Sequence, residues 1–361
     1  MRKTPLLDFH LEINGSIGSF ARWKMPMDYG NMLKEALETR NNVTFFDISH
    51  LSRIKVKGDD SEEFLQRLVA RDIKKVKENF ISGPTAFLNF NAGFKDDVMV
   101  YKFSKNDFLV VGNAVNHDKI IDWLHENIGE YKVTIEDLTF NTAMLAVQGP
   151  KSIEIMRKVL GDIIDSLTPL KFHTDIVTEH GVIKLLSYSG WTGETGFELI
   201  TDIETGEKIL RVLYEKGVRP AGLGARDILR IEMGYALYGN EISEDINPIE
   251  AKYWVFSWKK KDDYIGREAL LNILGKGIEK VRYGFVAKKG SALPRKGMKV
   301  FVGNREIGFI TSGTFSPILK LPIALGYVLS KYSINGLRVN IKGNKRIIDA
   351  KIVEPPFVKN L

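Results

Sequence analysis

Asp96 and Asp97 lie in a segment, residues 88–113, whose pattern predicts a β-hairpin. Their carboxylates are candidates for ligand binding or catalysis. We predict that residues 104–107 form the turn, so that residues whose numbers sum to about 211 lie opposite one another. Asp97 then faces Asn113 or Ala114. A carboxylate beside a carboxamide at the mouth of a hairpin can accept a hydrogen bond from a polar ligand, with apolar residues behind it as a dry wall. The alternative is that the two aspartates end a loop and cap a strand.

Glu198 is a second candidate, because it lies in an alternating strand just after the glycine-rich segment 190–196. Phe197 and Leu199 would point to the opposite face of that strand. A carboxylate among apolar neighbours needs a partner, and an ion pair with Arg226 would satisfy both charges. The same carboxylate could instead bind two adjacent N–H donors of a heterocycle. The residues alone leave both interpretations open.

Several common kinds of site are excluded by what the sequence lacks. It contains no cysteine, which excludes disulfides, thiolate nucleophiles and iron–sulfur ligation. It has no phosphate loop, no complete dinucleotide fingerprint, no GxSxG and no HExxH. Gly222 and Gly224 form half a dinucleotide loop, which a tight turn into a helix explains better. The six histidines show no ligand spacing, so we predict no metal site.

Composition predicts a folded, non-membrane protein. Of 361 residues, 44% are hydrophobic and 27% are charged, and no stretch has the roughly 18 apolar residues that a membrane span needs. We expect a cytoplasmic location. The formal charge of +7 favours an acidic partner. The basic residues are dispersed, and the densest run, 259–261, is followed by Asp262 and Asp263, so we predict no nucleic-acid partner.

These candidate residues need an α+β framework to position them. Asp60 and Glu63 have the spacing of a capping box at the start of a helix. We predict further helices over 31–40, 116–128, 152–160 and 207–215, with another opening near Arg226, and strands over 43–49, 85–90, 97–103, 108–111, 143–149, 183–189 and 196–201. Residues 281–355 are short β runs broken by glycine–asparagine turn pairs at 303–304, 335–336 and 343–344, which predict a small antiparallel barrel or sandwich.

An ordered set of motifs spans nearly the whole chain and resembles the aminomethyltransferase family, the T-proteins of the glycine cleavage system. The motifs that carry the resemblance are TPLLDFH (4–10), FARWKMPMDY (20–29), FFDISHL (45–51), LNFNAGFKDD (88–97), VVGN (110–113), AVQGP (146–150), GWTGETGFE (190–198), AGLGARDILRIEMGYALYGNEI (221–242), PIEA (248–251), IGREAL (265–270), TSGTFSP (311–317) and IALGYV (323–328).

The resemblance implies an α+β fold, a three-domain cloverleaf with a central folate channel and a small antiparallel β-barrel as its C-terminal domain. On this basis we expect a first, discontinuous folate-binding domain over 1–54 and 140–245 and a second α+β domain over 55–139. A linker and the barrel domain would occupy 246–361.

The resemblance also implies an activity, namely transfer of the one-carbon unit of the aminomethyl group on the lipoyl arm of H-protein to tetrahydrofolate. Ammonia is released and 5,10-methylenetetrahydrofolate forms. Asp97 matches the family residue that lies near the folate N5. Glu198 matches the family residue that binds the N–H edge of the pterin, and Arg226 matches the arginine of the family's folate site. We therefore expect Asp97 and Arg226 to be catalytic, and Asn113, Trp191 and Leu51 to line the folate pocket. The expected partners are lipoylated H-protein and tetrahydrofolate, without metal.

The chain departs from the family pattern at Arg22, Pro84 and Trp254. Two alternatives therefore stay open at this point. One is a folate-dependent demethylase of the same superfamily that acts on another methyl donor. The other is a non-catalytic folate-binding or RNA-associated protein, although no basic face with interleaved aromatic residues is evident in the sequence.

Overall fold

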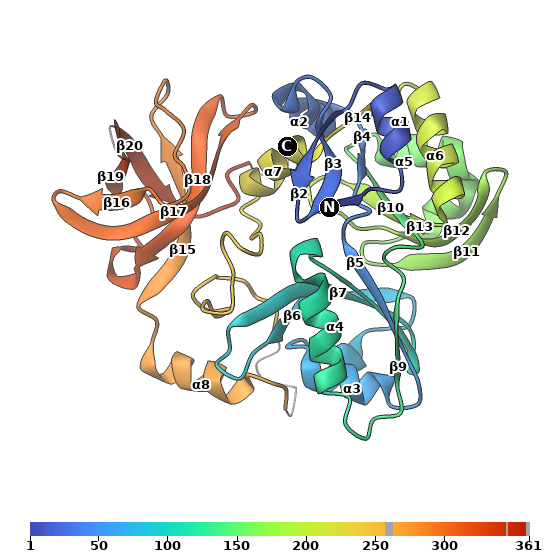
Figure 1. Ribbon diagram of the computed structural model, residues 1–361. Helices are drawn as coiled ribbons and strands as arrows, with labels where there is room; N and C mark the ends of the chain where they lie inside the picture. Colours follow the sequence, from blue (N-terminus) through green and yellow to red (C-terminus); the bar gives the residue numbers. More distant parts are fainter. Residues whose placement is uncertain (257–262, 344–345, 359–361) are drawn as a thin grey trace. The chain divides into compact units, whose positions relative to one another are not determined.

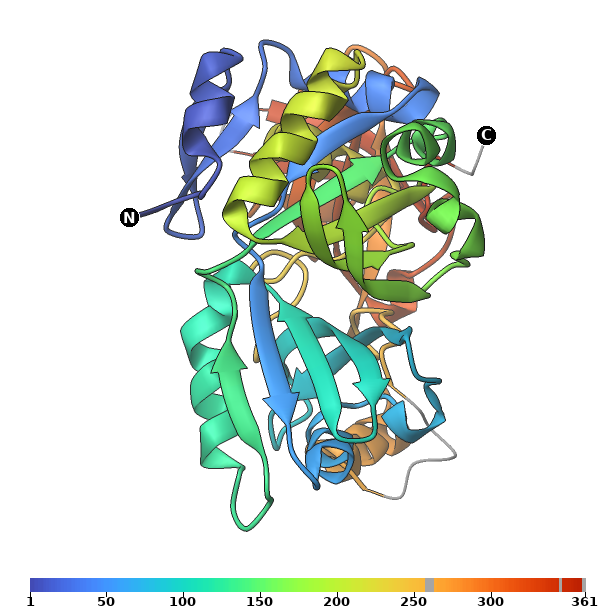
Figure 2. The same ribbon diagram turned by 90° about the vertical axis from the view of Figure 1, so that its right-hand side faces the viewer.

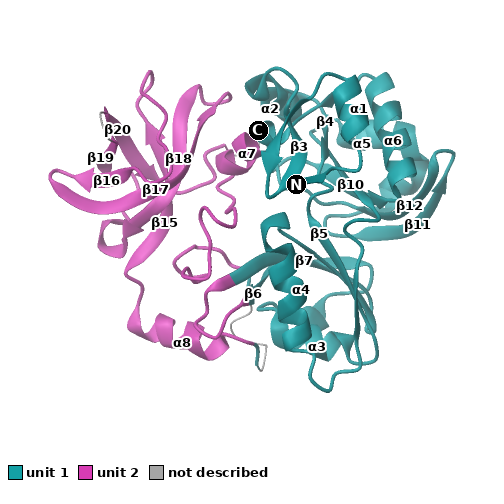
Figure 3. Cartoon of the chain, in the orientation of Figure 1, with its two compact units in different colours: residues 1–87, 95–226, 255–264 teal, residues 88–94, 227–254, 265–361 magenta. Residues whose placement is uncertain are grey.

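A computed structural model describes residues 1–256, 263–343 and 346–358 (Figure 1). The chain forms two compact units, coloured separately in Figure 3. Unit 1 comprises residues 1–87, 95–226 and 255–264, and unit 2 comprises residues 88–94, 227–254 and 265–361. The basic run 259–261 and Asn344 of one predicted turn lie outside the described residues.

Unit 1 contains a six-stranded sheet with the order β11-β12-β13-β10-β4-β14. Most neighbouring strands are antiparallel, but β14 runs parallel to β4. Figure 2 gives a second view of its strands. The bounds are β4 (Thr44–Asp47), β10 (Ala143–Gln148), β11 (Phe172–Thr178), β12 (Gly181–Ser187), β13 (Gly196–Thr201) and β14 (Arg219–Pro220).

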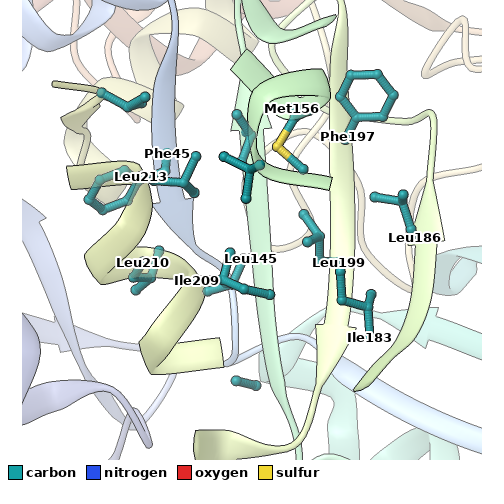
Figure 4. Packing of buried hydrophobic residues seen from close by; sticks show 14 of the residues in the cluster. Phe45, Leu145, Met156, Ile183, Leu186, Phe197, Leu199, Ile209, Leu210 and Leu213 are labelled. Carbon is teal, nitrogen blue, oxygen red and sulfur yellow. The ribbon is translucent and has the colours of Figure 1, made fainter. Parts of the chain in front are cut away.

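Two helices, α5 (Ser152–Leu160) and α6 (Ile203–Glu215), cover strands β10 and β13 of this sheet. The α6 helix begins where the side chain of Asp202 accepts a hydrogen bond from the Thr205 amide, and it buries Ile209, Leu210 and Leu213. These leucines and isoleucines meet Leu145 and Leu199 of the strands in one apolar core (Figure 4). Burial of this helical face holds the sheet rigid, so the residues on its strands keep fixed positions.

The N-terminal segment is tied to the sheet through one buried carboxylate. It contains α1 (Leu7–Glu12) and a three-stranded sheet of β1 (Arg2–Lys3), β3 (Trp23–Asp28) and β2 (Ser16–Phe20), and is followed by α2 (Met32–Asn41). Thr4 and His10 both hydrogen-bond Oδ2 of Asp47, and the Tyr29 hydroxyl contacts Nδ1 of His10 at 2.7 Å. These contacts, led by the bond from His10, outweigh burial and lower the pKa of Asp47 to about 2.

A five-stranded sheet with the order β6-β7-β8-β5-β9 carries the hairpin that the sequence predicts. Its strands are β5 (Ser52–Lys57), β6 (Phe80–Leu88), β7 (Phe94–Ser104), β8 (Asp107–Gly112) and β9 (Thr134–Asp137), accompanied by α3 (Ser61–Leu68) and α4 (His117–Glu126). The buried guanidinium of Arg53 donates to the carbonyl oxygens of Ser49, Leu51, Thr139 and Thr142. Arg53 therefore holds together the two connections between this sheet and the six-stranded one.

Unit 2 is built around a closed antiparallel barrel with the strand order β15-β18-β17-β16-β19-β20. The strands are β15 (Lys280–Ala287), β16 (Lys299–Val302), β17 (Arg305–Ser316), β18 (Leu321–Leu329), β19 (Arg338–Gly343) and β20 (Arg346–Val353), preceded by α8 (Arg267–Lys276). Apolar side chains from all six strands fill the barrel. Beside it, the buried guanidinium of Arg230 donates to Glu241 at 2.7 Å.

Most predicted elements are present, with two corrections. The predicted capping box is absent. Asp60 directly precedes α3, but its carboxylate accepts a hydrogen bond from the Lys132 amide at 2.8 Å, and Glu63 forms a salt bridge with Lys74. The helix expected near Arg226 begins three residues earlier, as α7 (Leu223–Glu232). The C-terminal β run is a barrel, as one of the two alternatives predicted. The division into three domains stays a prediction.

Within the described residues, no helix has both the length and the apolar character needed to cross a membrane.

Candidate functional site

The β7–β8 hairpin brings Asp97 and Asn113 together, and Asn113 is one of the two facing residues that the predicted register allowed. Met99 pairs with Val111, so that Asp97 lies opposite Asn113 at the open end of the hairpin. The Asn113 side-chain amide donates to Oδ1 of Asp97 at 2.7 Å. Asp97 is partly exposed and lies within β7, not in a loop, so the expectation that this aspartate pair ends a loop is wrong.

Asp96, to which the sequence assigned no specific binding role, is fully buried on the other face of β7. Its carboxylate accepts three hydrogen bonds. The donors are the Asn113 backbone amide at 3.0 Å, the Asn113 side-chain amide at 2.8 Å and the Asn116 side-chain amide at 2.6 Å. Burial, and then the neighbouring charge of Asp97, outweigh these donors and raise the pKa of Asp96 to about 8. The same Asn113 amide therefore joins a buried carboxyl group to an accessible one.

Glu198 lies on β13, almost buried, with its carboxylate in a network of hydroxyl groups. Ser189 donates to Oε2 of Glu198 at 2.6 Å, and Ser187 contacts Ser189 at 2.7 Å. The hydroxyl group of Tyr101 lies near this network, and burial, followed by the negative charge of Glu198, raises its pKa above the usual range.

Tyr101 relates Glu198 to Asp97. Asp97, Met99 and Tyr101 are alternate residues of β7 and share one face of the strand. Four residues of extended chain span ~13 Å, which is the distance along β7 from Asp97 to Tyr101, whose hydroxyl group is affected by the charge of Glu198. The two carboxylates proposed from sequence thus face the same side of the five-stranded sheet.

Arg226 is buried in α7, with its guanidinium carbon 5.1 Å from the centroid of the Trp191 ring, a distance at which a cation is attracted to an aromatic face. Burial lowers the pKa of Arg226, and the charge of Glu198 opposes this shift. Among the described residues, no salt bridge within 4.0 Å joins Arg226 to Glu198, and Nη1 of Arg226 is buried without a hydrogen-bond partner. The alternative in which these two groups satisfy each other by a direct ion pair is therefore wrong.

The glycine-rich segment 190–196 wraps around the buried side chain of Gln148. A Cβ atom added at Gly190 would lie 1.9 Å from Oε1 of Gln148, and one at Gly196 would lie 2.2 Å from Nε2. Gln148 accepts the Thr192 hydroxyl at 2.9 Å and donates to the Ser189 carbonyl at 3.0 Å. This close packing explains why the loop has glycine at positions 190 and 196.

Gly222 serves close packing and not phosphate binding. A Cβ atom there would lie 2.3 Å from the backbone of Met27, and the Gly222 amide donates to Glu35 at 2.9 Å. Leu51 is partly exposed directly after the turn that follows β4. Of the residues that depart from the family pattern, Arg22 and Pro84 are exposed and Trp254 is 60% exposed. The described part of the chain contains no group of three or more acidic or histidine side chains that could hold a metal ion.

Comparisons with known proteins agree with the motif pattern along the whole chain. Residues 6–261 match the family model of the GCVT N-terminal domain, and residues 280–359 match that of the glycine cleavage T-protein C-terminal barrel domain. The chain belongs to the aminomethyltransferase family of glycine cleavage T-proteins.

Relatives in this family match end to end. An aminomethyltransferase of Thermoanaerobacter pseudethanolicus is 40% identical over 99% of this chain and 98% of its own length. A probable aminomethyltransferase of Aeropyrum pernix is 35% identical with the same coverage. The crystal structure of the glycine cleavage system aminomethyltransferase T from Bartonella henselae superposes with a TM-score of 0.91 at 30% identity, over 99% of this chain and 98% of that chain.

Proposed function

We propose that the protein transfers the one-carbon unit of the aminomethyl group on the lipoyl arm of H-protein to tetrahydrofolate, with release of ammonia and formation of 5,10-methylenetetrahydrofolate. The observation that carries this proposal is the match to aminomethyltransferases over 99% of the chain. The geometry of Asp97, Glu198 and Arg226 supports it, because these three groups come from separate elements of unit 1 and none of them lies in a surface loop.

In the proposed reaction Asp97 accepts a hydrogen bond from the folate N5 and orients its lone pair. Its carboxylate offsets positive charge that develops on the nitrogen during transfer. Asn113 supports this role, because its amide bond to Oδ1 holds the Asp97 side chain in one rotamer. A preoriented carboxylate needs little rearrangement as the charge develops.

Glu198 and Arg226 would bind the heterocycle of tetrahydrofolate. The hydroxyl group of Ser189 donates to Oε2 of Glu198 and orients the carboxylate, which can then accept hydrogen bonds from adjacent N–H donors of the ligand. Arg226 keeps a buried donor without a partner, and such donors are rare in folded proteins unless water or a ligand completes them. Trp191, Asn113 and Leu51 would line the pocket. Location in the cytoplasm and the absence of a nucleic-acid partner stay predictions.

Turnover of Asp97→Asn tests the proposal. The variant keeps the size and one acceptor oxygen but loses the negative charge, so turnover should fall at least ~10-fold while folate affinity changes little. Asp118→Asn is a matched control, because Asp118 is exposed on α4. Both variants and the wild type are assayed with aminomethylated H-protein and tetrahydrofolate.

Asp96→Asn completes the comparison, although its bonds to Asn113 make it more than a control. A result in which Asp96→Asn abolishes turnover while Asp97→Asn retains it would show that the wrong carboxylate is assigned. Normal binding of tetrahydrofolate with no turnover from H-protein would favour the demethylase alternative.

A further inference from the structure

His50 is a buried histidine that no step of the proposed function uses. It lies three residues after the end of β4, and its side chain is 4% exposed. The Phe20 ring contacts it edge-on, with 5.4 Å between the ring centroids. Nδ1 of His50 is buried and has no hydrogen-bond partner. Buried polar atoms without a partner are unfavourable and rare in folded proteins, so this nitrogen calls for an explanation.

Arg226 is close to His50 for a topological reason. Strands β4 and β14 are parallel neighbours, with Arg219 paired to Thr44 and Pro220 paired to Phe45. Their chains leave the sheet at the same edge, one leading to His50 and the other through the start of α7 to Arg226. The proximity is evident in the electrostatics, since the charge of Arg226 acts on His50. Each of the two residues has a buried nitrogen without a partner.

We infer that His50 is a specificity-determining residue of the folate site proposed above, where its Nδ1 and the Nη1 of Arg226 together bind one carbonyl oxygen of the ligand. The inference rests on the proposed function for the identity of the ligand. A carbonyl oxygen fits because arginine can only donate hydrogen bonds, and an sp² oxygen has two lone pairs that can accept from two donors at once.

The electrostatics agree with a neutral donor at His50. Burial, and then the positive charge of Arg226, lower the pKa of His50 to about 3. The ring is therefore neutral at physiological pH and can carry its single proton on Nδ1. A second cation beside Arg226 would instead raise the cost of burying charge. A neutral donor and a cationic donor together favour an uncharged, polarised acceptor such as a ring carbonyl.

Three substitutions at His50 separate hydrogen bonding from shape. The side-chain amide of asparagine reaches the position of Nδ1, since both are bonded to Cγ, whereas glutamine extends toward the position of Nε2. Leucine fills the volume without a polar atom. Calorimetric titration of tetrahydrofolate into wild-type protein, His50→Asn, His50→Gln and His50→Leu gives the affinities, and circular dichroism checks that each variant is folded.

We expect His50→Leu and His50→Gln to bind tetrahydrofolate at least ~10-fold more weakly, the scale of one lost hydrogen bond to a buried partner. His50→Asn should stay within about threefold of wild type because it keeps a donor at the same place. If His50→Leu binds tetrahydrofolate with wild-type affinity, the inference is overturned, and a buried water molecule would be the partner of Nδ1 of His50 and Nη1 of Arg226. Equal weakening in the asparagine and leucine variants would overturn it as well. Absence of binding by the wild-type protein would instead reject the proposed function.

Discussion

At the scale of single residues, the register of one hairpin sorts two adjacent aspartates into different environments. Successive side chains of a strand point to opposite faces, so Asp96 is fully buried while Asp97 stays accessible. Asn113 contacts both carboxyl groups because it lies opposite Asp97 at the end of the pairing. The accessible carboxylate can meet a ligand, and the buried one holds the asparagine that orients it.

Asp96 should make stability depend on pH. In the unfolded chain it ionises near pH ~4, whereas in the folded protein its pKa is raised to about 8. Between these values the folded state holds a proton that the unfolded state has lost, so the Asp96 contribution to the free energy of unfolding falls as pH rises through this range. Asparagine cannot ionise, and Asp96→Asn should abolish this component.

Urea unfolding of the wild type and Asp96→Asn at several pH values measures the effect. Because all other titrating groups are shared, the stability of the wild type relative to the variant should decrease from pH ~5 to pH ~8. A constant difference across this range would mean that Asp96 is ionised in the folded protein throughout.

Glu198 should contribute to folate binding and much less to folding. Glu198→Ala removes an acceptor for the ligand, and we expect tetrahydrofolate affinity to fall by at least ~1.5 kcal/mol, the scale of a hydrogen bond to a charged group. Calorimetry measures the change, with Glu204→Ala as the control because Glu204 forms an exposed pair with Lys208. Unchanged affinity would restrict Glu198 to its structural hydrogen bond with Ser189.

At the scale of elements, the loop between β12 and β13 depends on one buried side chain. Gln148 is the last residue of β10, and Gly190 and Gly196 of the loop pack directly against its side chain. The same side chain forms hydrogen bonds with the Thr192 hydroxyl and the Ser189 carbonyl. The motifs AVQGP and GWTGETG are therefore two halves of one packing unit. This unit holds Trp191 beside Arg226.

Gly190→Ala should destabilise the protein by ~1–3 kcal/mol, because the added Cβ overlaps Gln148 in a packed interior. If the overlap is the cause, Gln148→Ala should relieve it, and the double variant should lose less than the sum of the two single losses. Thermal unfolding of all four proteins completes the cycle. Gly275→Ala is the control, since a Cβ atom at that helical position meets no atom within 4 Å beyond its chain neighbours and the adjacent backbone of its own helix. Additive losses would show that Gly190 is needed for another reason.

At the scale of the whole molecule, the net charge of +7 is the property that bears on the proposed partner. From the family resemblance we expect H-protein to be acidic. Opposite net charges accelerate the encounter of two proteins, and salt screens this attraction over a Debye length of ~8 Å at physiological ionic strength.

Association with H-protein should therefore slow as salt is added. We expect the association rate to fall at least ~3-fold between low and physiological ionic strength, while the dissociation rate changes less. Stopped-flow or surface-based kinetics on the intact proteins measures both rates, and the dissociation rate serves as the internal control. An association rate that does not respond to salt would separate the basic charge from this partner.

The sequence alone predicted the features that depend on local spacing. The 3.6-residue pattern predicted a helix over 207–215, which is part of α6 (Ile203–Glu215), and the period-2 pattern located β13 at 196–201. Counting from the predicted turn placed Asp97 opposite Asn113 or Ala114, and the irregularity between Lys102 and Ser104 in the observed pairing selects Asn113. The start of α7 was missed by three residues. Gly222, directly before the helix, packs closely against the backbone of Met27, and this long-range contact is not visible in the local sequence pattern.

Tertiary structure alone decided which distant groups meet. The sequence could not predict that His50 lies near Arg226, Tyr101 near Glu198, or Gln148 against the 190–196 loop. These residues are far apart in the chain and are brought together by the pairing of β4 with β14 and by packing between strands. The sequence also could not decide whether Glu198 and Arg226 form an ion pair or occupy two separate environments. Local periodicity sets which face a side chain occupies, whereas its partner depends on which elements the folded chain places against that face.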